Sequence, residues 1–437
     1  MAVISSFLAM ALSQATSESL TLEQAVQIAV DNAYSVQLSE SDFERAGQRY
    51  READGLLGPQ VNLVGSYTRT DGSGTASFGS PTNGGGTVSG LNEFKQFQVT
   101  ATKILDITGS ARNGVVAAKL QRDAAQEALN SELNSIKNQV RSQYFRVLQA
   151  DALVRVQSAE LVAAKQRLKN AEVRHAAGDL AKYDVLRLET ESKRSEQALV
   201  VAEGDLETTK QGLNSLLGRA IDIEFSVVDL VDLPVSDLSF QEAMKLAEAH
   251  RPEIRSREYS LESFERLRKL QQGGSLPTFT IGAQWTRVID PFPGQKASSA
   301  QAFLQFSIPL YNSGTSQAKV GAARQDEELA RISLEQTKQL VSLDVKGAIT
   351  QLETSRKAYA VAQQGLELAR EALRLAQLRY DEGAGILLDV TTSQSELTRA
   401  EGSVVTAKYQ YLTAVAALQR ACGTDDLTPR SGEDTSK

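Results

Sequence analysis

The sequence predicts a mainly α-helical chain with a β-barrel portion, in which duplicated half-repeats give four strands and long coiled helices per subunit. Three observations lead to this fold class. The chain of 437 residues repeats itself internally. Two segments of about 68 residues contain no proline, and four segments of about ten residues alternate apolar with polar side chains.

The internal repeat pairs the two halves at two successive offsets. The segment Leu20–Ala25 recurs as Leu238–Ala243, an offset of 218 residues. After the next loop the offset is 205 residues, and it pairs Asp184 with Asp389. Because loops absorb changes of length while packed elements do not, the break between the two offsets lies in a hairpin loop. Each half therefore reads helix, strand, loop, strand, long helix, turn, helix.

Turn residues and the repeat set the expected boundaries. The start, 1–18, is a short apolar run ending in small residues but without a basic n-region, which predicts a signal peptide or a disordered start. A linker is expected over 219–237 and a disordered tail over 424–437. Repeat 1 spans 19–218, with strands at about 59–70 and 94–106, a long helix at about 110–177, a tip turn at 178–183 and a return helix at 184–217. Repeat 2 spans 238–423, with strands at about 277–289 and 300–311, a long helix at about 315–382, a tip turn at 383–388 and a return helix at 389–422.

Composition excludes several classes of function. The formal charge of −7 argues against nucleic acid as a partner, because phosphate binding needs a basic surface. The two histidines, His175 and His250, are far apart in sequence, and the lone Cys422 has no nearby partner. No metal-ligand spacing or phosphate-binding loop occurs, so we expect no catalytic residues, no metal and no cofactor.

The four predicted strands carry an apolar face and a face of hydroxyl and amide side chains. A half-buried sheet packed on helices is the commoner source of such alternation. Two details favour a membrane barrel: the polar faces are almost uncharged, and Tyr67 and Trp285 share a repeat position near a strand end, where an aromatic girdle lies. The membrane-facing side chains are then Val61, Leu63, Tyr67, Val99, Phe279, Ile281, Trp285, Leu304 and Phe306.

Four strands cannot close a barrel, and lipid does not tolerate open sheet edges. The chain is therefore expected to oligomerise. Two copies would give a barrel of about eight strands filled by side chains, whereas three would give about twelve strands and room for a passage. On that ground we expect a homotrimer with a twelve-stranded transmembrane barrel in contact with lipid.

The long helices carry apolar residues on two sides. In the second repeat one seam follows Leu366, Ala369, Leu373, Ala376 and Tyr380, and another follows Leu368, Ala372 and Leu375. Two seams indicate a helix with neighbours on both sides, as in a tube of helices, although a solid bundle would also give two stripes.

The duplicated strand pair, the turns at Gly109 and Gly314, and the tips 174–178 and 379–383 resemble the TolC outer-membrane efflux family over about 20–423. The resemblance implies a trimeric outer-membrane barrel continued by a periplasmic α-helical barrel. Such a protein is the exit duct of a tripartite efflux or type I secretion system. Its partners are a periplasmic adaptor (membrane fusion protein) and an inner-membrane transporter, and its localisation is the outer membrane with a large periplasmic portion.

The resemblance also assigns roles at the tips. Adaptor docking falls on Arg174, Gly178, Leu180, Arg379, Gly383 and Ile386, and the pore constriction on Asp184, Asp389 and Tyr380. In a trimer each aspartate would form an acidic ring that attracts cations. The alternative interpretation is that each aspartate stabilises the N-terminal end of its helix. Tyr380 is expected to hydrogen-bond Asp184.

Three residues depart from the pattern of the family's best-known member. Gly385 stands in place of an arginine, Thr392 in place of a second aspartate and His175 in place of an aromatic residue. These differences predict a weaker closed-state gate. The main rival interpretation is a soluble periplasmic helical-hairpin adaptor or scaffold, which a wash without detergent would release from membranes. A second rival, an enzyme with a long helical insertion, has no supporting residues.

Overall fold

The structure is a computed structural model, and it describes residues 18–70, 92–229, 238–289, 291 and 296–424. The predicted signal segment up to residue 17, the first hairpin loop and the tail from residue 425 lie outside the described residues, as does part of the predicted linker. The chain divides into two compact units. The first comprises Met1–Ser41, Glu127–Ile254 and Gln336–Lys437, and the second comprises Asp42–Gln126 and Arg255–Glu335.

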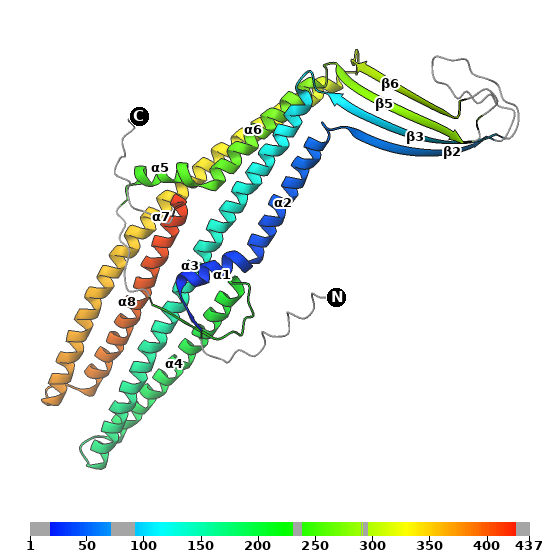
Figure 1. The fold of residues 1–437 in the computed structure, drawn as a ribbon. Helices are drawn as coiled ribbons and strands as arrows, with labels where there is room; N and C mark the ends of the chain where they lie inside the picture. The colour runs from blue at the N-terminus through cyan, green and yellow to red at the C-terminus, as the bar shows by residue number, and fades with distance from the viewer. Residues whose placement is uncertain (1–17, 71–91, 230–237, 290, 292–295, 425–437) are drawn as a thin grey trace, which may run out of the picture. The chain divides into compact units, whose positions relative to one another are not determined.

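The second unit contains a four-stranded antiparallel sheet in the order β2-β3-β5-β6 (Figure 1). Its strands are β2 (Gln60–Thr70), β3 (Asn92–Leu105), β5 (Thr278–Ile289) and β6 (Ser298–Ser307). One hairpin comes from each repeat, and the two meet where β3 pairs with β5. The sheet is open, with β2 and β6 as its edges. The last strand ends at Ser307 instead of continuing to 311, because Pro309 has no N–H to donate to a ladder.

Helices of the second unit are joined by hydrogen bonds and ion pairs. They are parts of α2 (Tyr34–Gly55), α3 (Ser110–Ala176), α6 (Pro252–Gly273) and α7 (Thr315–Asp381). Ser263 of α6, a buried residue, donates its hydroxyl to the carbonyl of Ala117 in α3 at 3.0 Å. Arg268 of α6 pairs with Glu327 of α7 at 2.5 Å. None of the helices that the structure describes is both long and apolar enough to cross a membrane.

The first unit holds α1 (Leu22–Asn32), α4 (Lys182–Leu216), α5 (Phe240–His250), α8 (Leu387–Cys422) and parts of the longer helices. Capping boxes start α1 at Thr21 and α5 at Ser239. The two repeats pack alike where each return helix ends. A Cβ on Gly218 would lie 2.6 Å from the carbonyl oxygen of Asn32, and one on Gly423 would lie 3.0 Å from that of His250.

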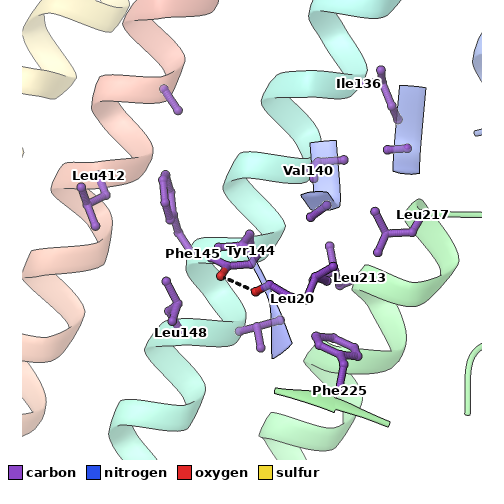
Figure 2. Close-up of a cluster of buried hydrophobic side chains, with 14 of the residues drawn as sticks. Leu20, Ile136, Val140, Tyr144, Phe145, Leu148, Leu213, Leu217, Phe225 and Leu412 are labelled. Atoms are coloured by element: carbon purple, nitrogen blue, oxygen red, sulfur yellow. Dashed lines mark hydrogen bonds between the residues drawn. The ribbon is translucent and has the colours of Figure 1, made fainter. Parts of the chain in front are cut away.

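A buried cluster lies where α1, α3, α4 and α8 meet in the first unit (Figure 2). Its fully buried side chains include Val140, Tyr144, Leu148, Leu213 and Leu217. Two strands complete it: β1 (Glu18–Leu20) pairs in parallel with β4 (Phe225–Val227). The sequence prediction missed both strands, because three-residue segments are too short to show an alternating pattern.

Candidate functional site

A glycine in the left-handed backbone region closes the helical tip of each repeat. Gly178 has φ of 87° and Gly383 has φ of 73°. Such an arrangement satisfies the last carbonyl groups of a helix and favours glycine, which has no Cβ to clash. In each tip the residue after the glycine donates its N–H to a carbonyl five positions earlier, Asp179 to Arg174 at 2.9 Å and Ala384 to Arg379 at 2.8 Å.

Two aspartates occupy equivalent positions just beyond the tips. Asp184 is the third residue of α4, and Asp389 is the third residue of α8. Neither helix has a side-chain cap, because Ala181 and Ile386 stand at the N-cap positions. Negative charge near the N-terminal end of a helix is stabilised by the helix dipole. Asp184 is half-buried and Asp389 is exposed, so both carboxylates remain accessible to water.

The two tips are joined by a contact between Arg174 and Tyr380. The guanidinium Nη1 of Arg174 donates to the Tyr380 hydroxyl at 3.0 Å, and the guanidinium carbon lies 5.5 Å from the centroid of the Tyr380 ring. The expected bond from Tyr380 to Asp184 is therefore replaced by one from Arg174. The Tyr380 hydroxyl acts here as an acceptor, and the sequence pattern does not distinguish an arginine partner from a carboxylate partner.

The residues that the resemblance assigns to docking are not equally accessible. Arg174, Gly178, Arg379 and Gly383 are exposed, and Ile386 is 60% exposed. Leu180 is half-buried and packs against the tip cluster of Ala171, Val185 and Leu188. Leu387 of α8 packs against the same cluster, so it connects the second hairpin to the first. Leu180 thus supports the tip from inside.

A polar network that the sequence prediction missed links three helices above the tips. Arg167 of α3 forms ion pairs with Glu160 of α3 at 2.6 Å and Glu191 of α4 at 3.1 Å. From α8, Gln394 and Thr398 donate to the second oxygen of Glu160 at 2.7 and 3.0 Å. These contacts connect α8 to α3 and α4. The sequence feature that could have indicated the network is the spacing of seven residues between Glu160 and Arg167.

The charged groups of this network are largely withdrawn from water. The side chains of Arg167, Glu160 and Glu191 are 19%, 10% and 20% exposed. Burial raises the pKa of the Glu191 carboxyl, and the Arg167 guanidinium opposes that shift. The Nε of Arg167 is buried without a hydrogen-bond partner in the described part of the chain. Such a network is costly to break, because removing one partner leaves an uncompensated charge.

A groove of about 560 Å³ lies between the first turns of α4 and α8. Arg187 crosses it, donating to the hydroxyl of Thr391 at 3.4 Å. Its lining residues are Tyr183, Leu186, Arg187, Thr190, Glu191, Arg194, Thr391, Thr392 and Ser395. The groove thus shares Glu191 with the buried network, and neither Asp184 nor Asp389 is among its lining residues.

The strand register places all the predicted membrane-facing residues on one face of the sheet. Leu63 pairs with Val99, Val99 pairs with Trp285, and Phe279 pairs with Phe306. Because paired residues share a face and side chains alternate along each strand, the remaining members follow. Several are strongly exposed in the single chain, with Leu63 at 68% and Phe306 at 67%. The opposite face carries residues such as Gln98, Thr100, Gln284 and Thr286.

Within the described ranges, no group of three or more His, Cys, Asp and Glu residues could hold a metal ion. Cys422 is free and buried, and burial raises the pKa of its thiol to about 11. A thiol with that pKa stays protonated at neutral pH and is a poor nucleophile.

Comparison with known proteins gives consistent matches. The family model described as "Outer membrane efflux protein" matches residues 25–219 and 243–424. The outer membrane efflux protein BepC of Brucella suis is 25% identical over 315 residues, covering 71% of this chain and 68% of BepC. The cobalt-zinc-cadmium resistance protein CzcC of Cupriavidus metallidurans is 25% identical over 419 residues, covering 92% of this chain and 90% of CzcC. The crystal structure of the outer membrane protein VceC of Vibrio cholerae superposes with a TM-score of 0.79 at 18% identity, covering 92% of this chain and 96% of VceC.

Proposed function

The chain belongs to the outer membrane efflux protein family, and we propose that three copies of it assemble into the exit duct of a tripartite efflux or type I secretion system. The family is one of outer-membrane channels with a large periplasmic helical portion, not of enzymes. The proposal adds the stoichiometry, the residues at the mouth and the surface that meets the other components.

The open sheet carries the proposal. Its apolar face holds Leu63, Trp285 and Phe306, and its two edges, β2 and β6, have no neighbour within the described chain. A strand edge exposed to lipid leaves backbone N–H and carbonyl groups without partners, which is strongly unfavourable. Pairing β6 of one copy with β2 of the next removes every edge once three copies form a ring of about twelve strands. The uncharged polar face then lines the passage.

The helical tips are the proposed docking surface for a periplasmic adaptor. Arg174, Gly178, Arg379 and Gly383 provide exposed backbone and guanidinium groups at the two tips, and Ile386 provides an apolar contact. The half-buried Leu180 belongs to this surface through the shape that it gives the first tip. The inner-membrane transporter then delivers its substrate through the adaptor to the duct.

At the mouth, Asp184 and Asp389 form the proposed pore constriction with Tyr380. Three copies of each carboxylate in a narrow opening would raise the local concentration of cations. Asp389 is the more exposed of the two, so it is the better site to test. Replacing Asp389 by alanine should lower the cation preference of the purified channel in planar bilayers. Asp381→Ala removes the same charge from the same tip and should leave the preference unchanged; equal preference in wild type and Asp389→Ala would contradict the filter.

Membrane extraction and crosslinking test the duct itself. The protein should stay in membranes washed with alkaline carbonate, require detergent for release, and then run as a trimer. A photocrosslinker at Ile386 should capture an adaptor protein, whereas one at Leu340, which lies in the middle of α7 and is exposed, should not. Release by the wash as a monomer would support a soluble periplasmic scaffold instead.

A further inference from the structure

The charged residues of the sheet are distributed in an unexpected way. The strands β2, β3, β5 and β6 contain five charged residues, namely Arg69, Glu93, Lys95, Lys103 and Arg287. The register puts all of them on the face that carries Leu63, Trp285 and Phe306, and none on the opposite polar face. In the proposed duct this face contacts lipid. The charged side chains therefore face the membrane and not the passage, which conflicts with the high cost of placing a charge in lipid.

Position along the strands resolves this conflict. Four of the charges lie at the hairpin end of the sheet. In the strand register there, Arg69 lies opposite Glu93, and Lys95 lies opposite Tyr67 on one side and Ile289 on the other. Lys103 lies eight residues further along β3, at the end where the helices join. At about 3.3 Å per residue, Lys95 and Lys103 are roughly 26 Å apart along the strand. Between them the outward residues of β3 are Phe97, Val99 and Ala101. The two lysines therefore bracket an apolar band that, for strands tilted by about 35–45°, is about 20 Å tall, close to the apolar band of about 25 Å on membrane barrels.

The described strand residues at the hairpin end carry more positive than negative charge. Among the described strand residues at this end, three basic side chains, Arg69, Lys95 and Arg287, accompany a single acid, Glu93. Lys95 pairs with Glu93 at 3.3 Å and lies 5.8 Å from the centre of the Tyr67 ring, with its side chain 43% exposed. Within the residues described, no hydrogen bond or ion pair engages the exposed guanidinium of Arg287. Within these strand residues, one acid is therefore matched against three cations.

We propose that Arg69, Lys95 and Arg287 form a binding site for the phosphate groups of an anionic lipid in the outer leaflet of the outer membrane. Helices leave the sheet at its other end and are periplasmic, so the hairpin end is at the outer surface. Long basic side chains pass their stems over apolar groups and place their charged ends at headgroup level. An arginine can bind two phosphate oxygens at once, and the neighbouring Tyr67 supplies the aromatic contact found at membrane interfaces. The site rests on the proposed function, because only an outward apolar face puts these cations against lipid.

Native mass spectrometry of the full-length protein in detergent tests the site. The probes are lipid A with both phosphates, the same lipid after enzymatic removal of the phosphates, and inorganic phosphate alone. Wild type should retain the phosphorylated lipid about tenfold more than the dephosphorylated one. The double variant Lys95→Gln, Arg287→Gln should lose this preference. Lys103→Gln removes one charge from the same face at the other end of the sheet and should keep the preference.

Three outcomes would overturn the site: equal retention of both lipids by wild type, an unchanged preference in the double variant, or displacement of the lipid by millimolar inorganic phosphate, which would indicate free phosphate as the ligand. Conductance of each sample in bilayers separates this inference from the proposed function. If wild type conducts and shows no phosphate preference, the lipid site alone is wrong. If no sample conducts and none requires detergent, the duct and the site are both wrong.

Discussion

The hydroxyl of Tyr144 lies 2.8 Å from the carbonyl oxygen of Leu20, a residue 124 positions away. Val228 contacts the same hydroxyl through two backbone groups. Its carbonyl oxygen lies 2.9 Å from the hydroxyl, and its N–H donates to the hydroxyl at 3.0 Å. Because a hydroxyl has one proton, it donates to one of the two carbonyls at a time. Tyr144 is fully buried, so this single group joins β1 and the residue after β4 to α3 inside the core.

Replacing Tyr144 by phenylalanine should destabilise the first unit by about 1–3 kcal/mol, because buried backbone groups lose their partner while the ring still fills its space. Thermal unfolding of the detergent-solubilised protein, followed by circular dichroism of the helices, measures the change. Tyr311→Phe is the matched control, since Tyr311 is 88% exposed. An unfolding temperature for Tyr144→Phe equal to that of the control would show that the hydrogen bonds of this hydroxyl do not contribute.

The polar network above the tips predicts a pH dependence of stability. Burial holds the pKa of Glu191 above its ordinary value of 4.5, so the folded chain binds more protons than the unfolded chain between the two values. Stability should therefore fall as pH rises through that interval. Glu191→Gln, which carries no charge at any pH, should make the unfolding temperature less sensitive to pH above 4.5.

Glu196 provides the control for this prediction on the same helix. Its hydrogen bond with Lys193 lowers the pKa of the Glu196 carboxyl, so its contribution has the opposite sign and is lost as pH falls. Glu196→Gln should therefore leave unchanged the decline of stability above pH 4.5. Parallel pH profiles for wild type and Glu191→Gln would contradict the assignment.

The sequence was sufficient to predict the repeat, the sheet faces and the long helices, because each depends on a pattern within one segment. Alternation along β5 places Ile281 and Trp285 on one face whatever the neighbouring strand does. Contacts between helices depend on how each helix is rotated, and one sequence does not specify that rotation. For this reason the partner of Tyr380 was predicted to be Asp184 although it is Arg174. The charges of the Glu160 network likewise look like a solvated helix face until three helices bring them together.

The tip glycines should resist substitution. Gly178→Ala or Gly383→Ala forces a Cβ into the left-handed region at a cost of about 1–2 kcal/mol. Urea unfolding of each variant measures the loss. Gly365→Ala lies within α7, where a Cβ meets no atom within 4 Å, and it should instead raise stability by about 0.5–1 kcal/mol. The opposite signs of the two changes in stability distinguish a conformational requirement for glycine from a general effect of adding a methyl group. Equal changes at the three positions would contradict the conformational requirement.

The contact between Arg174 and Tyr380 should influence opening of the mouth, because it joins the tip of one hairpin to the tip of the other. Tyr380→Phe removes the 3.0 Å hydrogen bond and keeps the ring on which the guanidinium rests, whereas Arg174→Ala removes both interactions. If the contact favours a closed mouth, single-channel conductance should rise in the order wild type, Tyr380→Phe, Arg174→Ala. A hydrogen bond to a charged group is worth about 1.5–3 kcal/mol at most in such settings, and exposure to water reduces it.

Tyr183→Phe is the matched control for the tip tyrosine, because Tyr183 is 72% exposed at the start of α4. Its conductance should equal that of wild type. Wild-type conductance in both Tyr380→Phe and Arg174→Ala would mean that the contact accompanies the closed tips and does not hold them.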